Sequence, residues 1–166
     1  MTVLKRFSVL SLAILFGLMA NLTDIPTAKA TCGTYYEDND DPNGGTYRQG
    51  FTTYTKHSGS YRGDYRLSTK SASDQFYQWW SPGGSCKDYV YYYAYLNNVN
   101  FTNKDARYSF QISSGGDGLK YVDQYNAPGG WNYVGIGLSD RQPHLSLSSY
   151  ATSGKTGADG VKFVTK

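Results

Sequence analysis

The sequence is poor in residues that build helices and reactive centres. Glutamate occurs once, at Glu37, and alanine and leucine are sparse, so residues that favour long helices are scarce. Cysteine and histidine occur twice each, and neither pair has the close spacing of a C-x-x-C or zinc-binding motif. No G-x-S-x-G motif is present. The composition therefore argues against a helical bundle, a zinc centre and a serine or cysteine hydrolase.

Long apolar runs are confined to the N-terminus. A short basic stretch precedes an uncharged, mostly apolar run over residues 7–20, and an A-x-A motif ends at Ala30. We therefore expect residues 1–30 to be a secretion signal peptide and residues 31–166 to form one extracellular domain. No later run is long enough to span a membrane. Acidic and basic residues nearly balance beyond the signal, which disfavours a nucleic-acid partner.

Cys32 and Cys86 both belong to the part expected to be secreted. An oxidising environment favours a disulfide between them, and a pair of free thiols is the alternative. The bond would close a loop of about 54 residues, worth on the order of 4 kcal/mol in the chain-entropy model. We expect one disulfide.

Short extended runs separated by Gly, Ser, Asn and Asp occupy most of the chain, and residues 37–45 are dense in turn formers. The pattern predicts a single-domain, all-β, antiparallel sandwich, jelly-roll-like and monomeric, without internal repeats. The expected strands are Tyr47–Tyr54, Asp64–Thr69, Gln75–Trp80, Tyr89–Asn97, Ala106–Ser113, Leu119–Tyr125, Trp131–Leu138, His144–Ser149 and Asp159–Thr165.

The tract Tyr89–Leu96 predicts a β-strand with two unlike faces, because side chains alternate across a strand. One face carries Val90, Tyr92, Ala94 and Leu96 and suits a core. The other carries a row of phenol rings: Tyr89, Tyr91, Tyr93 and Tyr95. Such a row is a candidate platform for sugars, which pack their C–H groups on aromatic rings. Cross-strand aromatic pairing that stabilises the sheet is the alternative.

Other aromatic residues extend this hypothesis. Trp79 and Trp80 are adjacent in an expected strand, so one faces inward and the other is a candidate ligand contact. Trp131 and Tyr133 share a face opposite Val134, Ile136 and Leu138, which predicts burial of the three aliphatic residues and a binding role for Tyr133.

From Tyr36 to Val164 the order of motifs resembles the golvesin C-terminal-like domain, also called the xanthan lyase carbohydrate-binding-module-like domain. The motifs that carry the resemblance are Asp38-Asn39-Asp40-Asp41, Tyr61-Arg62-Gly63-Asp64-Tyr65-Arg66, Tyr77-Gln78-Trp79, Tyr89–Tyr95, Val122-Asp123-Gln124 followed by Trp131–Gly135, and Gly157–Phe163. The chain departs from the family pattern at Phe51, where a Trp is common, and at Gly160, where an Ala is common.

The resemblance implies a β-sandwich of the kind usually appended to secreted bacterial enzymes. It makes Trp79 the buried tryptophan, which leaves Trp80 as the candidate ligand contact. Asp159 lies in the terminal motif, and we expect Asp159, Gln124 and Trp131 to have structural roles. A buried Asp159 needs hydrogen-bond donors, for which Arg62 and Arg66 are candidates. Trp131 is expected to plug a sandwich edge.

Asp38, Asp40 and Asp41 cluster hard oxygen ligands of the kind that Ca²⁺ prefers. The segment lacks the glycine and bidentate glutamate of an EF-hand loop, and Asx-turn chemistry is the alternative. No other cofactor is expected.

These observations predict a secreted bacterial, non-catalytic binding module that recognises a cell-wall or extracellular polysaccharide through its aromatic sheet face. One alternative is a secreted protein–protein interaction factor, such as a matrix component, inhibitor or competition protein, because tyrosine is also enriched at protein interfaces. A small hydrolase is the other alternative, and it requires a pocket that gathers aspartates or His144.

Overall fold

The computed structural model describes residues 32–41, 47–68, 75–83, 88–97, 100–113, 115–139, 142–149 and 154–166. The expected signal peptide, residues 1–30, lies outside the described residues, and so does Cys86. The signal and the disulfide therefore stay predictions.

The described chain is built from β-strands joined by turns, with one short 3₁₀ helix, η1 (Tyr61–Gly63). Every strand pairing is antiparallel, which confirms the all-β, antiparallel prediction. No helix in these segments is long and apolar enough to cross a membrane. The strands are β1 (Thr34–Glu37), β2 (Tyr47–Gln49), β3 (Phe51–Thr55), β4 (Asp64–Ser68), β5 (Phe76–Trp80), β6 (Asp88–Leu96), β7 (Ala106–Ser113), β8 (Gly116–Val122), β9 (Gly130–Ser139), β10 (His144–Ser148), β11 (Gly157–Ala158) and β12 (Val161–Thr165).

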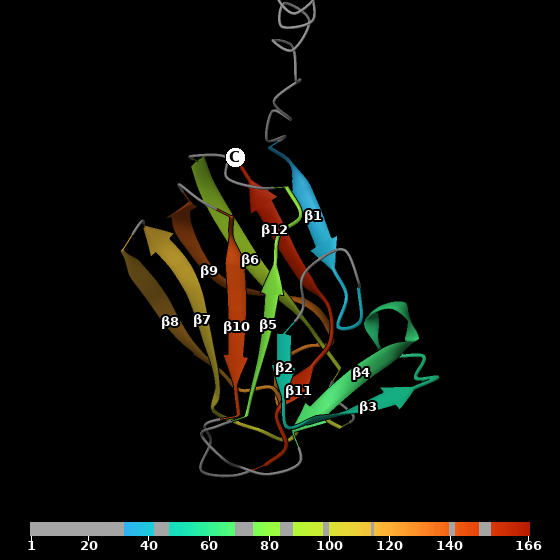
Figure 1. The fold of residues 1–166 in the computed structure, drawn as a ribbon. Helices are drawn as coiled ribbons and strands as arrows, with labels where there is room; N and C mark the ends of the chain where they lie inside the picture. Colours follow the sequence, from blue (N-terminus) through green and yellow to red (C-terminus); the bar gives the residue numbers. More distant parts are fainter. Residues whose placement is uncertain are drawn as a thin grey trace, which may run out of the picture.

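The strands form three sheets (Figure 1). A four-stranded sheet has the order β1-β12-β6-β9, and a five-stranded sheet has the order β2-β5-β10-β7-β8. A small three-stranded sheet, β11-β4-β3, lies at one end of the two larger sheets. Neighbouring strands are often far apart in sequence, so most of the fold depends on long-range pairing.

Strand β6 supplies the centre of the core. Its inward side chains are almost fully buried, with exposed fractions of 0% for Val90, Tyr92 and Leu96 and 3% for Ala94. The Tyr92 ring lies 5.2 Å from the ring of Phe110 in β7, and its hydroxyl donates a hydrogen bond to the Gln111 carbonyl at 3.0 Å. The same core contains side chains from the other strands of both large sheets, among them Tyr77, Trp79, Tyr108, Leu145, Leu147, Val161 and Phe163. The four- and five-stranded sheets therefore pack on each other through β6 and β7.

The expected strand over residues 47–54 is interrupted at Gly50. Gly50 has a φ of +75°, a conformation that favours glycine, and a Cβ there would come within 2.5 Å of the Gln75 side chain. Strand β2 before it pairs with β5, whereas β3 after it pairs with β4 in another sheet. The prediction of one continuous strand was wrong because the glycine turns the chain from one sheet to another.

Strand β1 was not expected, because turn-forming residues begin directly after it. It pairs with β12, where Tyr36 lies opposite Lys162. The predicted turn-rich segment 37–45 therefore begins with the last strand residue, Glu37.

The predicted burial of Ile136 and Leu138 was wrong. A bulge in β9 shifts the pairing with β6, so that Tyr92 lies opposite Gly135 and Tyr93 opposite Tyr133. The extra residue, Val134, is buried at 2% exposure, and beyond it the alternation is reversed. Ile136 and Leu138 consequently face solvent, with 39% and 44% of their surfaces exposed.

Candidate functional site

The outward face of the four-stranded sheet is lined by aromatic side chains, and we call it the aromatic face. One row of residues crosses all four strands. In the strand register, Tyr36 of β1 lies opposite Lys162 of β12, which lies opposite Tyr93 of β6. Tyr93 in turn lies opposite Tyr133 of β9. The face also includes the other predicted tyrosines of β6, Trp131 of β9, and a ring that the sequence did not nominate, Tyr61 of η1. Alternation along β6 thus places Tyr89, Tyr91, Tyr93 and Tyr95 together, away from the core.

Trp131 lies at the centre of a group of packed rings. Its ring centroid lies 5.1 Å from that of Tyr61, 5.2 Å from that of Tyr95 and 5.6 Å from that of Tyr36. Tyr61 and Tyr95 also contact each other, with centroids 5.7 Å apart. These contacts hold the rings in fixed orientations at one end of the aromatic face.

Other members of the aromatic face are more open. Tyr89 and Tyr133 are exposed over 56% and 51% of their surfaces, whereas Tyr91, Tyr93 and Tyr95 are half-buried by their neighbours. Among the described residues, the ring of Tyr133 packs only on that of Tyr93, with centroids 5.6 Å apart. The face therefore has a packed end and an accessible end.

Cationic groups lie among the rings. Lys162 Nζ is 4.1 Å from the centroid of Tyr93 and 5.3 Å from that of Trp131. Lys166 Nζ is 5.5 Å from the centroid of Tyr91. The outward positions of the described strands β1, β12, β6 and β9 carry no Asp or Glu. The aromatic face is therefore positive as well as aromatic.

Trp80 is not part of the aromatic face. Strand β5 belongs to the five-stranded sheet, where Trp79 points into the core at 1% exposure and Trp80 points away from it. The Trp80 ring packs on His144 of β10 at 4.9 Å. The structure thus separates Trp80 from the tyrosines with which the sequence analysis grouped it.

Gln124 and Asp159 hold the segment that leads into β12. The Gln124 side chain accepts a hydrogen bond from the Gly157 N–H at 2.9 Å and donates to the Gly157 carbonyl at 2.8 Å. The Asp159 carboxylate accepts from the backbone N–H groups of Tyr61, at 3.1 Å, and Gly160, at 2.9 Å. Backbone amides, and not the expected arginines, therefore donate to this carboxylate, and one of these bonds positions Tyr61 in the aromatic face.

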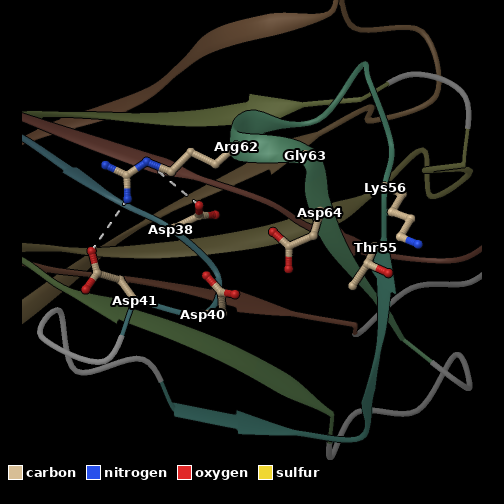
Figure 2. A pocket seen from close by; sticks show the side chains of 8 residues that line it. All are labelled: Asp38, Asp40, Asp41, Thr55, Lys56, Arg62, Gly63 and Asp64. Carbon is tan, nitrogen blue, oxygen red and sulfur yellow. Dashed lines mark ion pairs between the residues drawn. The ribbon is translucent and has the colours of Figure 1, made fainter.

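A second feature is an open hollow of about 620 Å³ beside β1, η1 and β4, and we call it the acidic hollow (Figure 2). Its lining residues are Asp38, Asp40, Asp41, Thr55, Lys56, Arg62, Gly63 and Asp64. Arg62 lies 3.9 Å from Asp38 Oδ2 and 3.8 Å from Asp41 Oδ2. Arg62 is more than half exposed and has a φ of +53°, a value uncommon outside glycine and asparagine.

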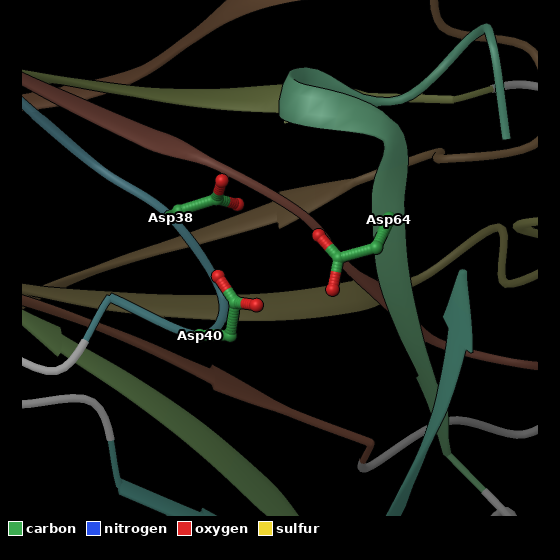
Figure 3. A group of neighbouring side chains, drawn as sticks. All are labelled: Asp38, Asp40 and Asp64. Carbon is green, nitrogen blue, oxygen red and sulfur yellow. The ribbon is translucent and has the colours of Figure 1, made fainter. Parts of the chain in front are cut away.

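Within the acidic hollow, the carboxylates of Asp38, Asp40 and Asp64 converge (Figure 3). One oxygen from each lies within 4.8 Å of the others. Asp41, which the sequence analysis grouped with Asp38 and Asp40, instead pairs with Arg62. Asp64 was missed because it lies at the start of β4, distant in sequence, and only the fold brings it to the other two.

Burial perturbs the acids in and around the hollow. Burial, and then the charges of Asp64 and Asp40, raise the pKa of Asp38 to about 6. Burial also raises the pKa of Asp64, with a further contribution from Asp40. The pKa of Glu37 is raised to about 7 and that of Asp159 to about 8, in both cases mainly by burial. These carboxylates are therefore expensive to ionise in the folded protein.

No protein-family model and no curated protein sequence matches this chain. Among solved structures, part of a Paenibacillus xanthan lyase is similar, with a TM-score of 0.67 and 21% sequence identity. This chain shares its fold with that part. The match covers 83% of this chain but only 13% of the xanthan lyase chain, so this chain corresponds to a small portion of that protein.

Proposed function

We propose that this chain is a secreted, non-catalytic β-sandwich module, akin to the golvesin C-terminal-like domain, that binds an extracellular polysaccharide along its aromatic face. The observation that carries the proposal is the continuous row from Tyr36 through Lys162 and Tyr93 to Tyr133, flanked by Trp131. The Cys32–Cys86 disulfide is part of the same proposal, since secretion favours it.

Aromatic side chains on a regular sheet suit an extended sugar chain. The ring faces pack against sugar C–H groups, and the phenol hydroxyls hydrogen-bond to sugar hydroxyls. Tyrosine adds such contact area at little entropic cost because it has few rotatable bonds. The β6 row from Tyr89 to Tyr95 extends over about 20 Å at ~3.3 Å per residue, which allows contact with several successive sugars.

The charge of the aromatic face favours an acidic polysaccharide. Lys162 and Lys166 lie among the rings, and the outward positions of the four described strands supply no carboxylate to repel an anion. The structurally similar protein is a xanthan lyase, and xanthan is a polysaccharide. That likeness is in keeping with a carbohydrate ligand for this chain as well.

A catalytic role is less well supported by the two hollows. The residues that line the acidic hollow include no aromatic ring on which a sugar could stack. A smaller hollow of about 290 Å³ contains His144, whose Nε2 lies 3.8 Å from Asp117 Oδ1, but its lining residues include no serine or cysteine nucleophile. The acidic hollow gathers the aspartates that the hydrolase alternative requires, and the smaller one contains His144, but neither combines them with a stacking ring or with a serine or cysteine among its described lining residues.

Binding can be tested by affinity electrophoresis with an acidic polysaccharide, xanthan, and a neutral one, dextran. Tyr133→Ala should weaken xanthan binding about tenfold, since an aromatic contact contributes about 1.4 kcal/mol. Tyr121→Ala is the matched control, because Tyr121 lies on β8 with the same 51% exposure as Tyr133. The control should bind like the wild type, and added salt should weaken binding.

The proposal fails if the folded wild-type protein is retained by neither polysaccharide, or if Tyr133→Ala and Tyr121→Ala behave alike. If added salt does not weaken the binding of the protein to xanthan, the preference for an acidic ligand is contradicted. Thermal unfolding of both variants establishes that they remain folded.

A protein partner is the second candidate function, and the bulge in β9 favours it. Ile136 and Leu138 expose aliphatic surface next to the tyrosines, on the edge strand of the four-stranded sheet. Aliphatic side chains beside tyrosines are common at protein interfaces. The test is co-purification from culture supernatant. A stoichiometric protein partner would favour this function if its association survives glycan-degrading enzymes and is abolished by Leu138→Ser.

A further inference from the structure

The acidic hollow contains three convergent carboxylates, and together with Asp41 they outnumber the cations beside them, which are Lys56, Arg62 and Arg66. Asp38 and Asp40 follow β1, and Asp64 begins β4. Arg62 reaches Asp38 from the solvent side, and Arg66 lies 3.8 Å from Asp64 Oδ2. Within the described residues, Asp40 forms no ion pair. Three like charges within 4.8 Å repel one another unless a cation or protons offset them.

A buried amide oxygen is the second observation. The Asn39 head group enters the same cluster through Nδ2, which donates to Asp64 Oδ1 at 3.3 Å and to the Asp64 carbonyl at 3.2 Å, and its backbone N–H donates to Asp38 Oδ1 at 2.8 Å. Asn39 is 1% exposed, and its Oδ1, the other end of the amide, has no hydrogen-bond partner among the described residues. Leaving such an oxygen unpaired in the interior costs about 1–3 kcal/mol.

A cation satisfies both observations. The two ends of an amide have the same shape, so Asn39 can rotate to place Oδ1 where Nδ2 faces the Asp64 carboxylate and the Asp64 carbonyl oxygen. Two oxygens facing each other are unfavourable, but they become co-ligands when a metal ion lies between them. The open side of the hollow leaves room for water to complete the coordination.

We propose that Asp38, Asp40 and Asp64, with Asn39 Oδ1, form a Ca²⁺ site. The ligands are hard oxygens from carboxylates and an amide, and the group contains no histidine or cysteine to favour zinc. Mixed carboxylate and amide oxygens with a water-filled side suit the flexible coordination of Ca²⁺ better than the strict octahedron of Mg²⁺. The site does not depend on the proposed polysaccharide ligand.

The ion would join the end of β1 to the start of β4, directly after η1. Because η1 carries Tyr61, which packs on Trp131, the site would also fix one end of the aromatic face. Ca²⁺ is thus assigned a structural role.

The test is calorimetric titration of EDTA-treated protein with CaCl₂ and with MgCl₂ up to about 10 mM, a range that covers extracellular Ca²⁺ sites. We expect one Ca²⁺ per chain and little response to Mg²⁺. Asp40→Asn should weaken Ca²⁺ binding at least tenfold. Asp105→Asn, an exposed acid in a loop remote in sequence, is the matched control and should bind as the wild type does.

Asp40 is chosen because it is exposed, so its variant is expected to fold, whereas Asp64→Asn alters a buried group. The melting temperature of the wild type should rise with CaCl₂ and that of Asp40→Asn should rise less. Absence of one-to-one binding up to about 10 mM, or equal binding by Asp40→Asn and Asp105→Asn, overturns the site. Either result leaves the polysaccharide measurement untouched, since that uses variants of the other face.

Discussion

At the scale of single residues, Gly160 determines where the ring of Tyr61 lies. A Cβ at Gly160 would be 2.4 Å from Tyr61 Cδ1, closer than any ordinary contact. Glycine at this position therefore has a physical reason, because only glycine leaves space for a ring that packs on Tyr95 and Trp131. The backbone N–H of the same glycine also bonds Asp159.

Gly160→Ala should destabilise the fold by about 1–3 kcal/mol, since the added methyl overpacks the space that the Tyr61 ring occupies. It should also weaken polysaccharide binding, because the packed end of the aromatic face is displaced. Urea unfolding and affinity electrophoresis measure the two effects. Gly33→Ala is the control, since nothing lies within 4 Å of its Cβ position. Equal stability of the two variants would contradict the assigned role.

At the scale of elements, the bulge in β9 decides what the edge of the aromatic face presents. It turns Ile136 and Leu138 outward and turns Gly135 and Gly137 inward toward β7. A Cβ at Gly137 would lie 2.0 Å from the Gln111 carbonyl oxygen, which is backbone and cannot rotate away. The glycines therefore let β9 and β7 approach closely at this corner of the core.

Gly137→Ala should destabilise the protein by about 3 kcal/mol, because a strand must shift to relieve the clash. Gly115→Ala is the control, as no atom lies within 4 Å of its Cβ position, and it should stay within about 0.5 kcal/mol of the wild type. Denaturant midpoints compare the two. A stability of Gly137→Ala close to that of the control would mean that β7 and β9 are further apart than the structure has them.

Sequence patterns predicted the elements whose determinants are local. The faces of β6 follow from strict alternation, so the inward position of Tyr92 and the outward positions of its odd-numbered neighbours could be predicted. The bulge at Val134 could not be predicted, since one extra residue leaves no mark in composition and reverses every face after it. Tyr61 and Asp64 were missed for a different reason: long-range strand pairing brings each to its site.

At the scale of the whole molecule, charge is divided between the two candidate sites. The aromatic face carries lysines, whereas carboxylates gather at the acidic hollow and extend to Glu37 and Asp159. An acidic ligand bound to the aromatic face, as proposed above, would therefore lie away from the aspartates of the acidic hollow. Protons, or the Ca²⁺ proposed above, would offset the charge of the carboxylates in the hollow.

Stability without Ca²⁺ should fall as pH rises. The folded pKa of Asp159 is about 8, above its ordinary value of 3.8, so the folded state holds this proton more tightly than the unfolded state. The resulting stabilisation is complete below pH 3.8 and is lost as pH rises toward 8; Glu37, with a pKa of about 7, adds to the same trend. Melting temperatures in EDTA should therefore decrease from about pH 5 to pH 8.

Asp159→Asn should flatten this dependence, because an amide oxygen can still accept from Tyr61 and Gly160 but carries no titrating proton. Asp105→Asn should keep the wild-type slope. A melting temperature that rises between pH 5 and pH 8 in the wild type would show that these acids are not buried as described.

The pairing of β1 with β12 has a mechanical consequence. Gly33, just before β1, and Thr165, at the end of β12, are hydrogen-bonded neighbours, because the Thr165 N–H donates to the Gly33 carbonyl with an N···O distance of 2.9 Å. A pull applied at both of these points would act across the antiparallel pair and break its bonds one after another, as in unzipping. Shearing, which loads all bonds at once, is not available in this geometry, so a tethered copy should yield at low force, beginning with β1.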